Sequence, residues 1–444
     1  MDEPTQPNKT LLMVSGHDED SDLVETILDP KTNQTAFAIW CGENAEIVEF
    51  AATRCGRAVP YSPSNNLLSH RVVLFPSAAV EYSSERDLIA AIHSFIHRYA
   101  DLSETFEEVA TYYVLFSWVY DGFAEVPYLR LKGDFGSGKS RCLQTIGSLC
   151  YKPMFASGAS TVSPIFRIID SFRGTLVIDE GDFRFSDERA ELIKILNNGN
   201  TAGFPVLRSD VTPSKEFNPR AFNVFGPKII ATRRLFDDRA LESRCITETM
   251  TGLPPRAGIP FSLPVAFHSE ALTLRNQLLM YRFRTFRTPR SMDRATSPEI
   301  EPRISQVYAP LLAVIKDESA QARVVDLAKA ASRAIRAERG TSIEAELVEA
   351  LYELRQEGAA LSVKAIAERF AGRFGDDYRR PITARWVGSQ LRNRLSLLPV
   401  KTHGAYVIPP TEERRLQGLF DRYRPGDRGT LGTTWLDDEK GSVE

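Results

Sequence analysis

The chain has 444 residues, of which 43% are hydrophobic and 25% charged, and its formal net charge is −3. These values are ordinary for a folded protein of two to four domains and exclude a chain too polar to build a core. So small a net charge gives no overall attraction to nucleic acid, so any such contact must come from local basic patches. Five cysteines without C-x-x-C spacing, and no apolar run near the ~18 residues of a membrane span, predict a cytoplasmic protein.

Residues 1–30 are polar and acidic, which predicts a flexible tail. Residues 31–103 hold strand-like runs (AFAIW, VVLF) broken by Gly, Pro and Asn, so we expect a mixed α/β module there. Two amphipathic segments follow, ERDLIAAIHSFIHRY (Glu85–Tyr99) and TFEEVATYYVLFSWVY (Thr105–Tyr120), and their periodicity predicts helices. The second belongs to a larger core segment, residues 104–253.

A glycine-rich motif opens this core segment. Residues Gly133–Ser140 read GDFGSGKS, which fits G-x-x-x-x-G-K-[ST], between the strand-like PYLRL and the helical RCLQTIGSL. In such a loop the backbone N–H groups surround a phosphate, and the following helix N-terminus adds positive charge. Lys139 would reach the β- and γ-phosphates, and the Ser140 hydroxyl would ligate Mg²⁺. We therefore expect nucleotide contacts from Gly133, Asp134, Phe135, Gly136, Ser137, Gly138, Lys139, Ser140 and Arg141.

A second motif indicates hydrolysis. Residues Gly174–Glu180 read GTLVIDE, which suits a buried parallel strand that ends in two carboxylates. Asp179 would hold Mg²⁺ through water, and Glu180 would act as general base on the attacking water. The alternative is a strand closed by solvated turn carboxylates. The adjacent glutamate, and the lack of an N-K-x-D segment in the right place, argue against a small-molecule kinase or a GTPase.

A third strand is predicted in GPKIIATRR (Gly226–Arg234), where Thr232 would stand at the carboxyl end and orient the lytic water. The next segment, FDDRALESRCI, carries Arg239 and Arg244 near an expected helix end. Either arginine alone would be an exposed surface charge. Nothing else in the segment supplies positive charge to a γ-phosphate, which favours a catalytic role.

With Lys139, Asp179, Glu180, Thr232 and Arg244 in these places, residues 114–245 resemble the AAA+ ATPases, most closely the MCM-like and superfamily-III-like helicase ATPases of mobile genetic elements. The resemblance implies an α/β P-loop NTPase core, a parallel sheet flanked by helices. It also implies a Walker A motif at Gly133–Ser140, a Walker B motif at Asp179–Glu180, a sensor 1 at Thr232 and an arginine finger at Arg244. That finger would complete the site of a neighbouring subunit. Many relatives carry Asn in place of Thr232.

Residues 197–228 lie between the second and third strands. Within them, GFPVLR and AFNVF look like two strands joined by a polar turn that holds Arg208, Lys215 and Arg220. In the similar ATPases an insertion at this place projects into the pore of the ring and grips DNA. By that resemblance Arg208 and Lys215 are the candidate DNA contacts. The alternative is an ordinary surface hairpin with solvated charges.

The segment after residue 253 begins Pro/Gly-rich, and helices around Glu270–Thr285 and Ile304–Ala337 would form a helical lid within residues 254–338. Residues 339–412 read as a winged helix. Helices are expected at Ser342–Gln356 and Ser362–Phe374, and a third opens at Thr383. The strand-turn-strand segment LPVKTHGAYVIP follows, Ala367 and Val387 are expected in the core, and residues 413–444 read as a flexible tail.

Between Arg373 and Lys401 the chain carries seven Lys or Arg against two Asp, a net charge of +5 in an acidic protein. This local basic charge indicates a DNA-binding element, for which Arg385, Arg392 and Lys401 are the candidates. Winged helices also serve as protein-docking modules, and that alternative stays open.

Together these features predict a hexameric, DNA-dependent AAA+ ATPase, a helicase or translocase of a mobile element that uses ATP and Mg²⁺ and binds its own copies and DNA. The alternative is a non-translocating AAA+ regulator, loader or phage-defence ATPase bound to DNA. A protein unfoldase is a third class and is less favoured, because residues 151–159 only loosely imitate an unfoldase pore loop.

Overall fold

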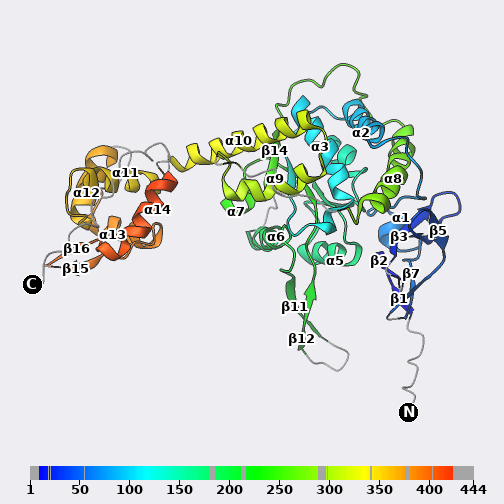
Figure 1. Cartoon of the computed structure of the whole chain (residues 1–444), viewed down its shortest axis with the longest axis horizontal. Helices are drawn as coiled ribbons and strands as arrows, with labels where there is room; N and C mark the ends of the chain where they lie inside the picture. The colour runs from blue at the N-terminus through cyan, green and yellow to red at the C-terminus, as the bar shows by residue number, and fades with distance from the viewer. Residues whose placement is uncertain are drawn as a thin grey trace, which may run out of the picture. The chain divides into compact units, whose positions relative to one another are not determined.

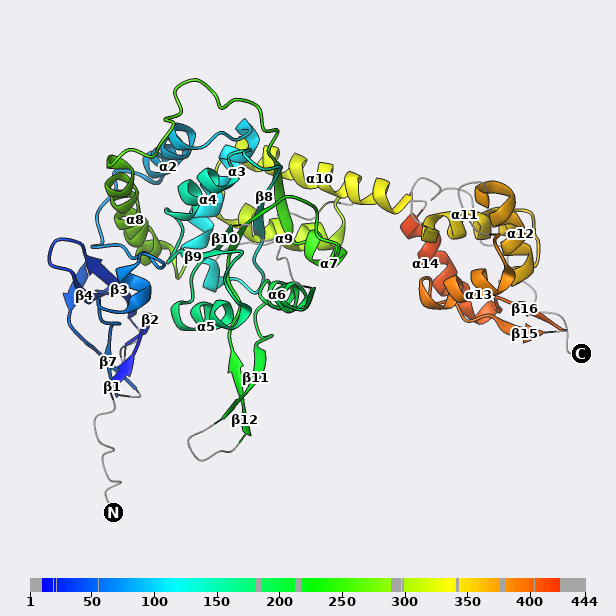
Figure 2. The ribbon, with the colours of Figure 1, turned by 180° about the vertical axis from the view of Figure 1, so that it is seen from behind.

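The computed structural model describes residues 10–18, 20, 22–54, 56–179, 186–211, 217–288, 297, 299–340, 343–375, 381–402 and 404–423. The chain divides into two compact units, Met1–Lys329 and Ala330–Glu444. Figures 1 and 2 draw both units, and each is described here by itself.

A five-stranded parallel sheet forms the centre of the first unit, in the order β14-β8-β13-β10-β9. Its strands are β8 (Tyr128–Lys132), β9 (Met154–Ser157), β10 (Leu176–Asp179), β13 (Lys228–Thr232) and β14 (Cys245–Thr249). Most residues of β8, β10 and β13 are buried, as expected for parallel strands that are covered on both faces. Because the strands are parallel, their carboxyl ends meet at one edge of the sheet, where ligands of such sheets bind.

Helices flank this sheet (Figure 2). They are α2 (Glu85–Tyr99), α3 (Glu104–Ser117), α4 (Lys139–Gly147), α5 (Val162–Phe172), α6 (Ser186–Asn198), the short α7 (Arg239–Glu242), and a 3-10 turn at Tyr120–Gly122. The hydroxyls of Ser84 and Ser103 accept backbone N–H groups of the first turns of α2 and α3, which explains where these helices begin. The α/β core that the motifs predicted is confirmed.

Two small sheets and a short helix precede the core. One sheet has the order β2-β3-β4-β5 and the other the order β1-β7-β6. The elements are β1 (Thr10–Leu12), β2 (Ser15–His17), β3 (Leu23–Asp29), β4 (Gln34–Trp40), β5 (Ala45–Val48), β6 (Ala51–Thr53), β7 (Gly56–Val59) and α1 (Asn66–Ser69). The expectation of a flexible tail over residues 1–30 is therefore wrong for the described strands of residues 10–29. Its acidic composition misled, because Glu25 is buried and paired rather than solvated.

The predicted hairpin between the second and third core strands is present as β11 (Val206–Val211) and β12 (Phe217–Phe222), and it projects from the sheet in Figure 1. Arg208 lies directly opposite Arg220 in the antiparallel register. The expectation that both arginines occupy the turn is wrong, because strand pairing continues past the apolar runs. Lys215 lies outside the described residues.

Beyond β14 the first unit continues with α8 (Ala266–Thr285), α9 (Pro302–Val314) and the start of α10 (Glu318–Gly340). The periodic stretch predicted at Ile304–Ala337 is thus two helices. Asp317 separates them, and its Oδ1 accepts the backbone N–H of Ala320 at the start of α10. Among the described residues, no helix combines the length and the apolar character that crossing a membrane requires.

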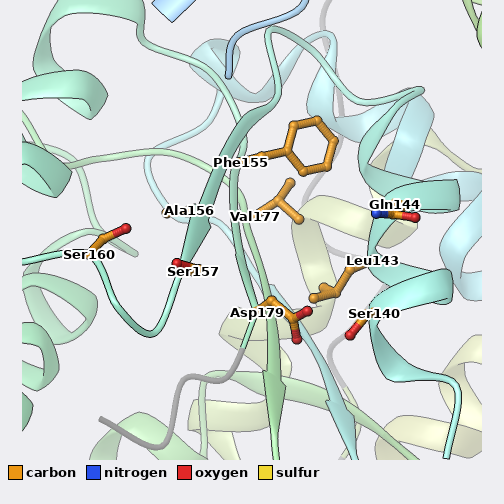
Figure 3. A pocket seen from close by; sticks show the side chains of 9 residues that line it. All are labelled: Ser140, Leu143, Gln144, Phe155, Ala156, Ser157, Ser160, Val177 and Asp179. Carbon is orange, nitrogen blue, oxygen red and sulfur yellow. The ribbon is translucent and has the colours of Figure 1, made fainter. Parts of the chain in front are cut away.

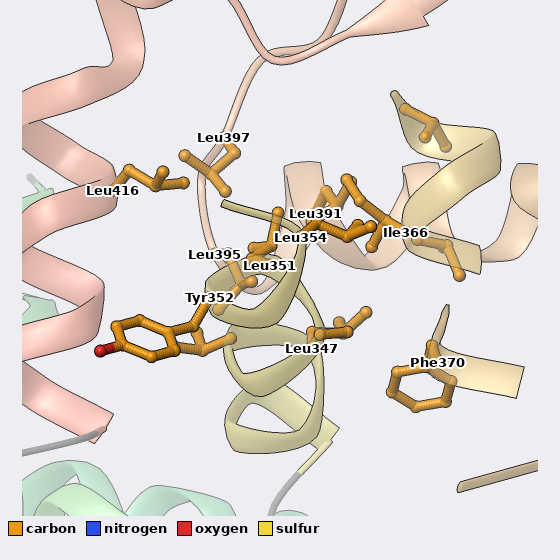
Figure 4. Close-up of a cluster of buried hydrophobic side chains, with 14 of the residues drawn as sticks. Leu347, Leu351, Tyr352, Leu354, Ile366, Phe370, Leu391, Leu395, Leu397 and Leu416 are labelled. Carbon is orange, nitrogen blue, oxygen red and sulfur yellow. The ribbon is translucent and has the colours of Figure 1, made fainter. Parts of the chain in front are cut away.

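The second unit holds α11 (Ile343–Gln356), α12 (Val363–Phe374), α13 (Ala384–Asn393), β15 (Val400–Thr402), β16 (Ala405–Val407), a 3-10 turn at Pro410–Glu412 and α14 (Glu413–Tyr423). Its core gathers apolar side chains from all four helices (Figure 4). Ala367 and Val387 are buried in it, as predicted. The expectation of a flexible tail from residue 413 is wrong for α14, because Leu416 and Phe420, one turn apart, pack into this core.

Candidate active site

The carboxyl edge of the sheet holds a cavity of about 260 Å³. The carboxyl ends of three strands form its walls. Strand β8 leads into the glycine-rich loop, β10 ends at Asp179 and β13 ends at Thr232. The N–H of Gly133 donates to the carbonyl of Thr232 over 3.1 Å, which joins the loop to the third strand. The lining residues are Phe135, Gly136, Ser137, Gly138, Lys139, Ser140, Arg141, Asp179, Ala231, Thr232 and Arg233.

A second cavity, of about 360 Å³, adjoins the first and shares Ser140 and Asp179 with it. Figure 3 shows the Asp179 carboxylate and the Ser140 hydroxyl pointing toward the same space. A hydroxyl and a carboxylate are oxygen donors of the kind that Mg²⁺ prefers, so this pair fits the ion that the motifs imply.

The glycines of the loop are required by its geometry. Gly136 and Gly138 have φ angles of 77° and 88°, which a residue with a side chain rarely adopts. A Cβ on Gly133 would lie 2.7 Å from the Ser137 hydroxyl and 2.8 Å from the Met250 carbonyl. Gly138 also precedes α4, which has no side-chain cap, so the first N–H groups of that helix are open to a phosphate.

Lys139 is folded over the loop that precedes it. Its Nζ donates to the carbonyls of Gly133 and Asp134 at 2.8 and 2.6 Å. The ammonium therefore stands at the mouth of the phosphate cradle, where carbonyl acceptors can be exchanged for phosphate oxygens. Arg141 behaves differently, because its guanidinium donates to the carbonyls of Pro260 at 3.0 Å and Phe261 at 2.8 Å. Its side chain thus holds the segment that leads to α8.

Thr232 is 1% exposed, and its Oγ1 has no hydrogen-bond partner among the described residues. An unpaired buried hydroxyl costs free energy, so its retention beside the cavity suits a group that binds a water or a ligand. Glu180 follows Asp179 directly but lies outside the described residues, so its role as general base stays a prediction.

Arg244 lies at the opposite edge of the sheet. It immediately precedes β14, whose first residue, Cys245, pairs with Tyr128 at the amino end of β8. Five residues of strand, on the order of 16 Å, separate this edge from the phosphate cradle. The guanidinium donates to the side-chain oxygens of Asn200 and Asn197, each at 2.7 Å. Burial, and then the nearby Arg303, lower the pKa of Arg244. No pattern in the sequence indicates that these two asparagines contact Arg244.

The candidate DNA contacts lie in two places. In the hairpin, Arg208 stands 3.2 Å from the Glu191 carboxylate and over the ring of Phe166. In the second unit, Arg385, Arg392 and Lys401 are exposed and form no ion pair with any residue that the structure describes. Two other basic residues of that stretch are neutralised, Arg373 by Glu353 and Arg394 by Glu344.

No family model and no curated protein sequence matches the chain. Solved structures that align with it include the NrS-1 C-terminal region, at 12% identity and a TM-score of 0.36 over 87% of this chain and 96% of that one. A full-length MCM homolog from Methanopyrus kandleri aligns at 12% identity and a TM-score of 0.37, over 71% and 74%. The active helicase SCCmec type IV Cch aligns at 11% identity and a TM-score of 0.34, over 91% and 95%. With TM-scores this low, any function must rest on the residues of the site. The resemblance to helicase-like AAA+ ATPases therefore rests on the motifs of the site.

Proposed function

We propose that the chain is an ATP-hydrolysing, DNA-dependent AAA+ motor, a helicase or translocase that works as a hexameric ring. One observation carries the proposal: Lys139, Ser140, Asp179 and Thr232, which come from the start of α4 and the ends of β10 and β13, line a single cavity. A cation, two oxygen donors for a metal and an unpaired hydroxyl are the groups that phosphoryl transfer to water requires.

In the proposed reaction the triphosphate lies in the loop, and Lys139 exchanges its carbonyl acceptors for β- and γ-phosphate oxygens. Ser140 and Asp179 hold Mg²⁺, which when bound neutralises the charge that develops on the phosphates. Glu180 accepts the proton of the attacking water, and Thr232 donates or accepts a hydrogen bond that keeps this water in line. Hydrolysis thereby needs no covalent bond between the protein and the phosphate.

The proposal includes a second copy of the chain. Arg244 stands at the edge of the sheet opposite to its own phosphate cradle, so it acts on a nucleotide only if that nucleotide belongs to a neighbour. Subunits that each supply an arginine to the next site form a head-to-tail contact. Such contacts close into a ring when the rotation between subunits closes, which is the arrangement proposed here.

The proposal assigns DNA contacts to two surfaces. The hairpin carries Arg208 and Lys215 and follows the helix after the second catalytic strand, which suits a pore loop that moves with the nucleotide state. The second unit is a winged helix in this proposal, with α13 and the β15–β16 hairpin presenting Arg385, Arg392 and Lys401 to phosphates. Helices α8, α9 and α10 act as the lid in this proposal.

The test uses the full chain and compares ATP turnover and strand displacement with and without DNA, next to Lys139→Ala. We expect turnover that DNA stimulates, unwinding of a forked duplex, and loss of both in the variant. DNA-stimulated turnover without unwinding or movement along DNA would instead support the DNA-bound regulator. Turnover equal in the wild type and Lys139→Ala would overturn the assignment of the site.

A further inference from the structure

The carboxyl end of α6 holds the guanidinium of Arg244 through two amide side chains. Nε donates to Oδ1 of Asn200 and Nη1 to Oδ1 of Asn197, each over 2.7 Å. Asn200 is 2% exposed, and Asn197 is oriented by its own bond from Nδ2 to the Asp238 carboxylate at 2.8 Å. The Asp238 contact leaves Oδ1 of Asn197 as the acceptor for Arg244. Asn197 is thus oriented, and Asn200 is buried, independently of the guanidinium.

The acceptors that hold Arg244 are neutral. Within the described part of the chain, no carboxylate forms an ion pair with it. The nearby charged groups are another cation, Arg303, which lowers the pKa of Arg244, and the Asp238 carboxylate, which raises it less strongly. A hydrogen bond from a guanidinium to a neutral amide is weaker than one to an acceptor that also carries a charge, such as a carboxylate or a phosphate. The guanidinium is therefore held in a defined direction and still gains free energy by moving onto an anion.

The residues that follow α6 also contact the base of the β11–β12 hairpin. The buried ammonium of Lys228 donates to the carbonyl of Gly199 at 3.1 Å, next to Asn200. It also donates to the carbonyls of Val224 and Gly226, at 3.0 and 2.8 Å, just after β12. A displacement of the end of α6 is thus passed to the hairpin through one side chain.

We infer that Asn197 and Asn200 are positioning residues for Arg244. They present its guanidinium toward the γ-phosphate of a neighbouring subunit, and they let it leave when that phosphate is bound. Release of the guanidinium frees the end of α6 and, through Lys228, the base of the hairpin. This inference rests on the proposed function, because it names the groups that set the action of the proposed finger.

The test replaces a neutral acceptor of the Arg244 guanidinium by a charged one. Asn200→Asp keeps the shape of the side chain and places a carboxylate against Arg244, which should retain the guanidinium in its own subunit. The matched control is Asn198→Asp, which adds the same charge at an exposed neighbouring position. Each variant is made in the wild-type and in the Arg244→Ala background. Turnover, nucleotide affinity and thermal stability are measured on the full chain.

We expect Asn200→Asp to lower kcat about tenfold, ~1.4 kcal/mol, without loss of nucleotide affinity, because its own phosphate cradle lies at the other edge of the sheet. In the Arg244→Ala background the same change should have no further effect on kcat. Asn197→Ala, which removes one acceptor, should lower kcat only when Arg244 is present. This variant replaces Asn200→Asp in the test if Asn200→Asp fails to fold. Equal effects of Asn200→Asp and Asn198→Asp, or effects that persist without Arg244, would overturn the inference. Full turnover in Arg244→Ala alone would instead count against the proposed finger.

Discussion

The guanidinium of Arg282, in α8, donates from Nε to Oε1 of Glu25, in β3, over 2.7 Å, and both side chains are 1% exposed. Oε2 of the same carboxylate lies 3.0 Å from the ammonium of Lys152, which follows α4. Arg282 also contacts Asp121 through both oxygens of that carboxylate. Three buried charges, with the partly exposed Asp121 as a fourth, therefore join the amino-terminal strands, the core and α8.

Glu25→Gln should destabilise the first unit by roughly 3–5 kcal/mol, because it leaves buried cations without their carboxylate. Glu46→Gln, an exposed change in β5, is the control and should shift stability by less than about 0.5 kcal/mol. Thermal unfolding followed by calorimetry checks both. Equal melting temperatures for the two variants would show that the buried group does not hold the strands to the core.

Lys228 predicts a pH dependence of stability. Burial lowers the pKa of its ammonium from 10.5 to about 7. Between these values the unfolded chain binds a proton that the folded chain does not, so this contribution rises with pH. Below about pH 7 both states are protonated and the burial cost is fully present.

The measurement compares the free energy of unfolding of the wild type with that of Lys228→Met from about pH 6 to about pH 9, so that groups common to both cancel. The free energy of unfolding of the wild type should rise relative to that of the variant as the pH rises, by at most ~1.4 kcal/mol per pH unit. A difference that stays flat, or that shrinks with rising pH, would contradict a lowered pKa.

Thr232→Val separates catalysis from stability at the third strand. The replacement keeps the shape and removes a buried hydroxyl that has no partner among the described residues, so the melting temperature should stay equal or rise. Turnover should fall on the order of a hundredfold, because the attacking water loses a positioning contact. Thr232→Ser restores the hydroxyl and should recover most of the rate. Unchanged turnover in the valine variant would remove Thr232 from the reaction.

The glycine-rich loop and the carboxylate strand were predictable because their signals are local. A motif of eight residues between a strand and a helix describes its own geometry, and the loop, β8, β10 and β13 lie where the patterns put them. The cavity itself then follows from parallel pairing, which brings the ends of the strands to one edge.

The errors share a cause that is not local. The acidic composition of residues 1–30 predicts a flexible tail that includes Glu25, yet the partner of Glu25, Arg282, lies 257 residues away along the chain. The sequence does not predict the helix from Glu413, because its apolar stripe of Leu416 and Phe420 is short. Only packing against the core of the second unit makes this helix stable. The contact of Arg244 with Asn197 and Asn200 is also not predictable from local signals, because it joins the end of α6 to the start of β14.

Mixed assemblies test whether Arg244 acts on a neighbouring site. Arg244→Ala and Lys139→Ala should each lose roughly 10³-fold in turnover. When the two are mixed, some interfaces pair an intact loop with an intact arginine, so part of the activity should return. Arg239→Ala, which removes an exposed arginine at the start of α7, should keep near wild-type turnover. Absence of recovery at every mixing ratio, with co-assembly shown by tagged pull-down, would contradict action between subunits.

Salt dependence tests whether the exposed cations of the second unit contact DNA. Arg385→Ala, Arg392→Ala and Lys401→Ala should each weaken duplex binding and reduce the slope of log affinity against log salt by about 0.9, because each removes one phosphate contact. Arg394→Ala is the matched control. It removes the same charge, but its guanidinium lies 2.8 Å from the Glu344 carboxylate and is already neutralised.

Fluorescence anisotropy over a series of salt concentrations measures all four slopes. If Arg394→Ala flattens the slope as much as the other three, the contact is general charge attraction, and the assignment to these side chains is wrong. If none of the four changes it, the second unit does not bind duplex DNA through this surface.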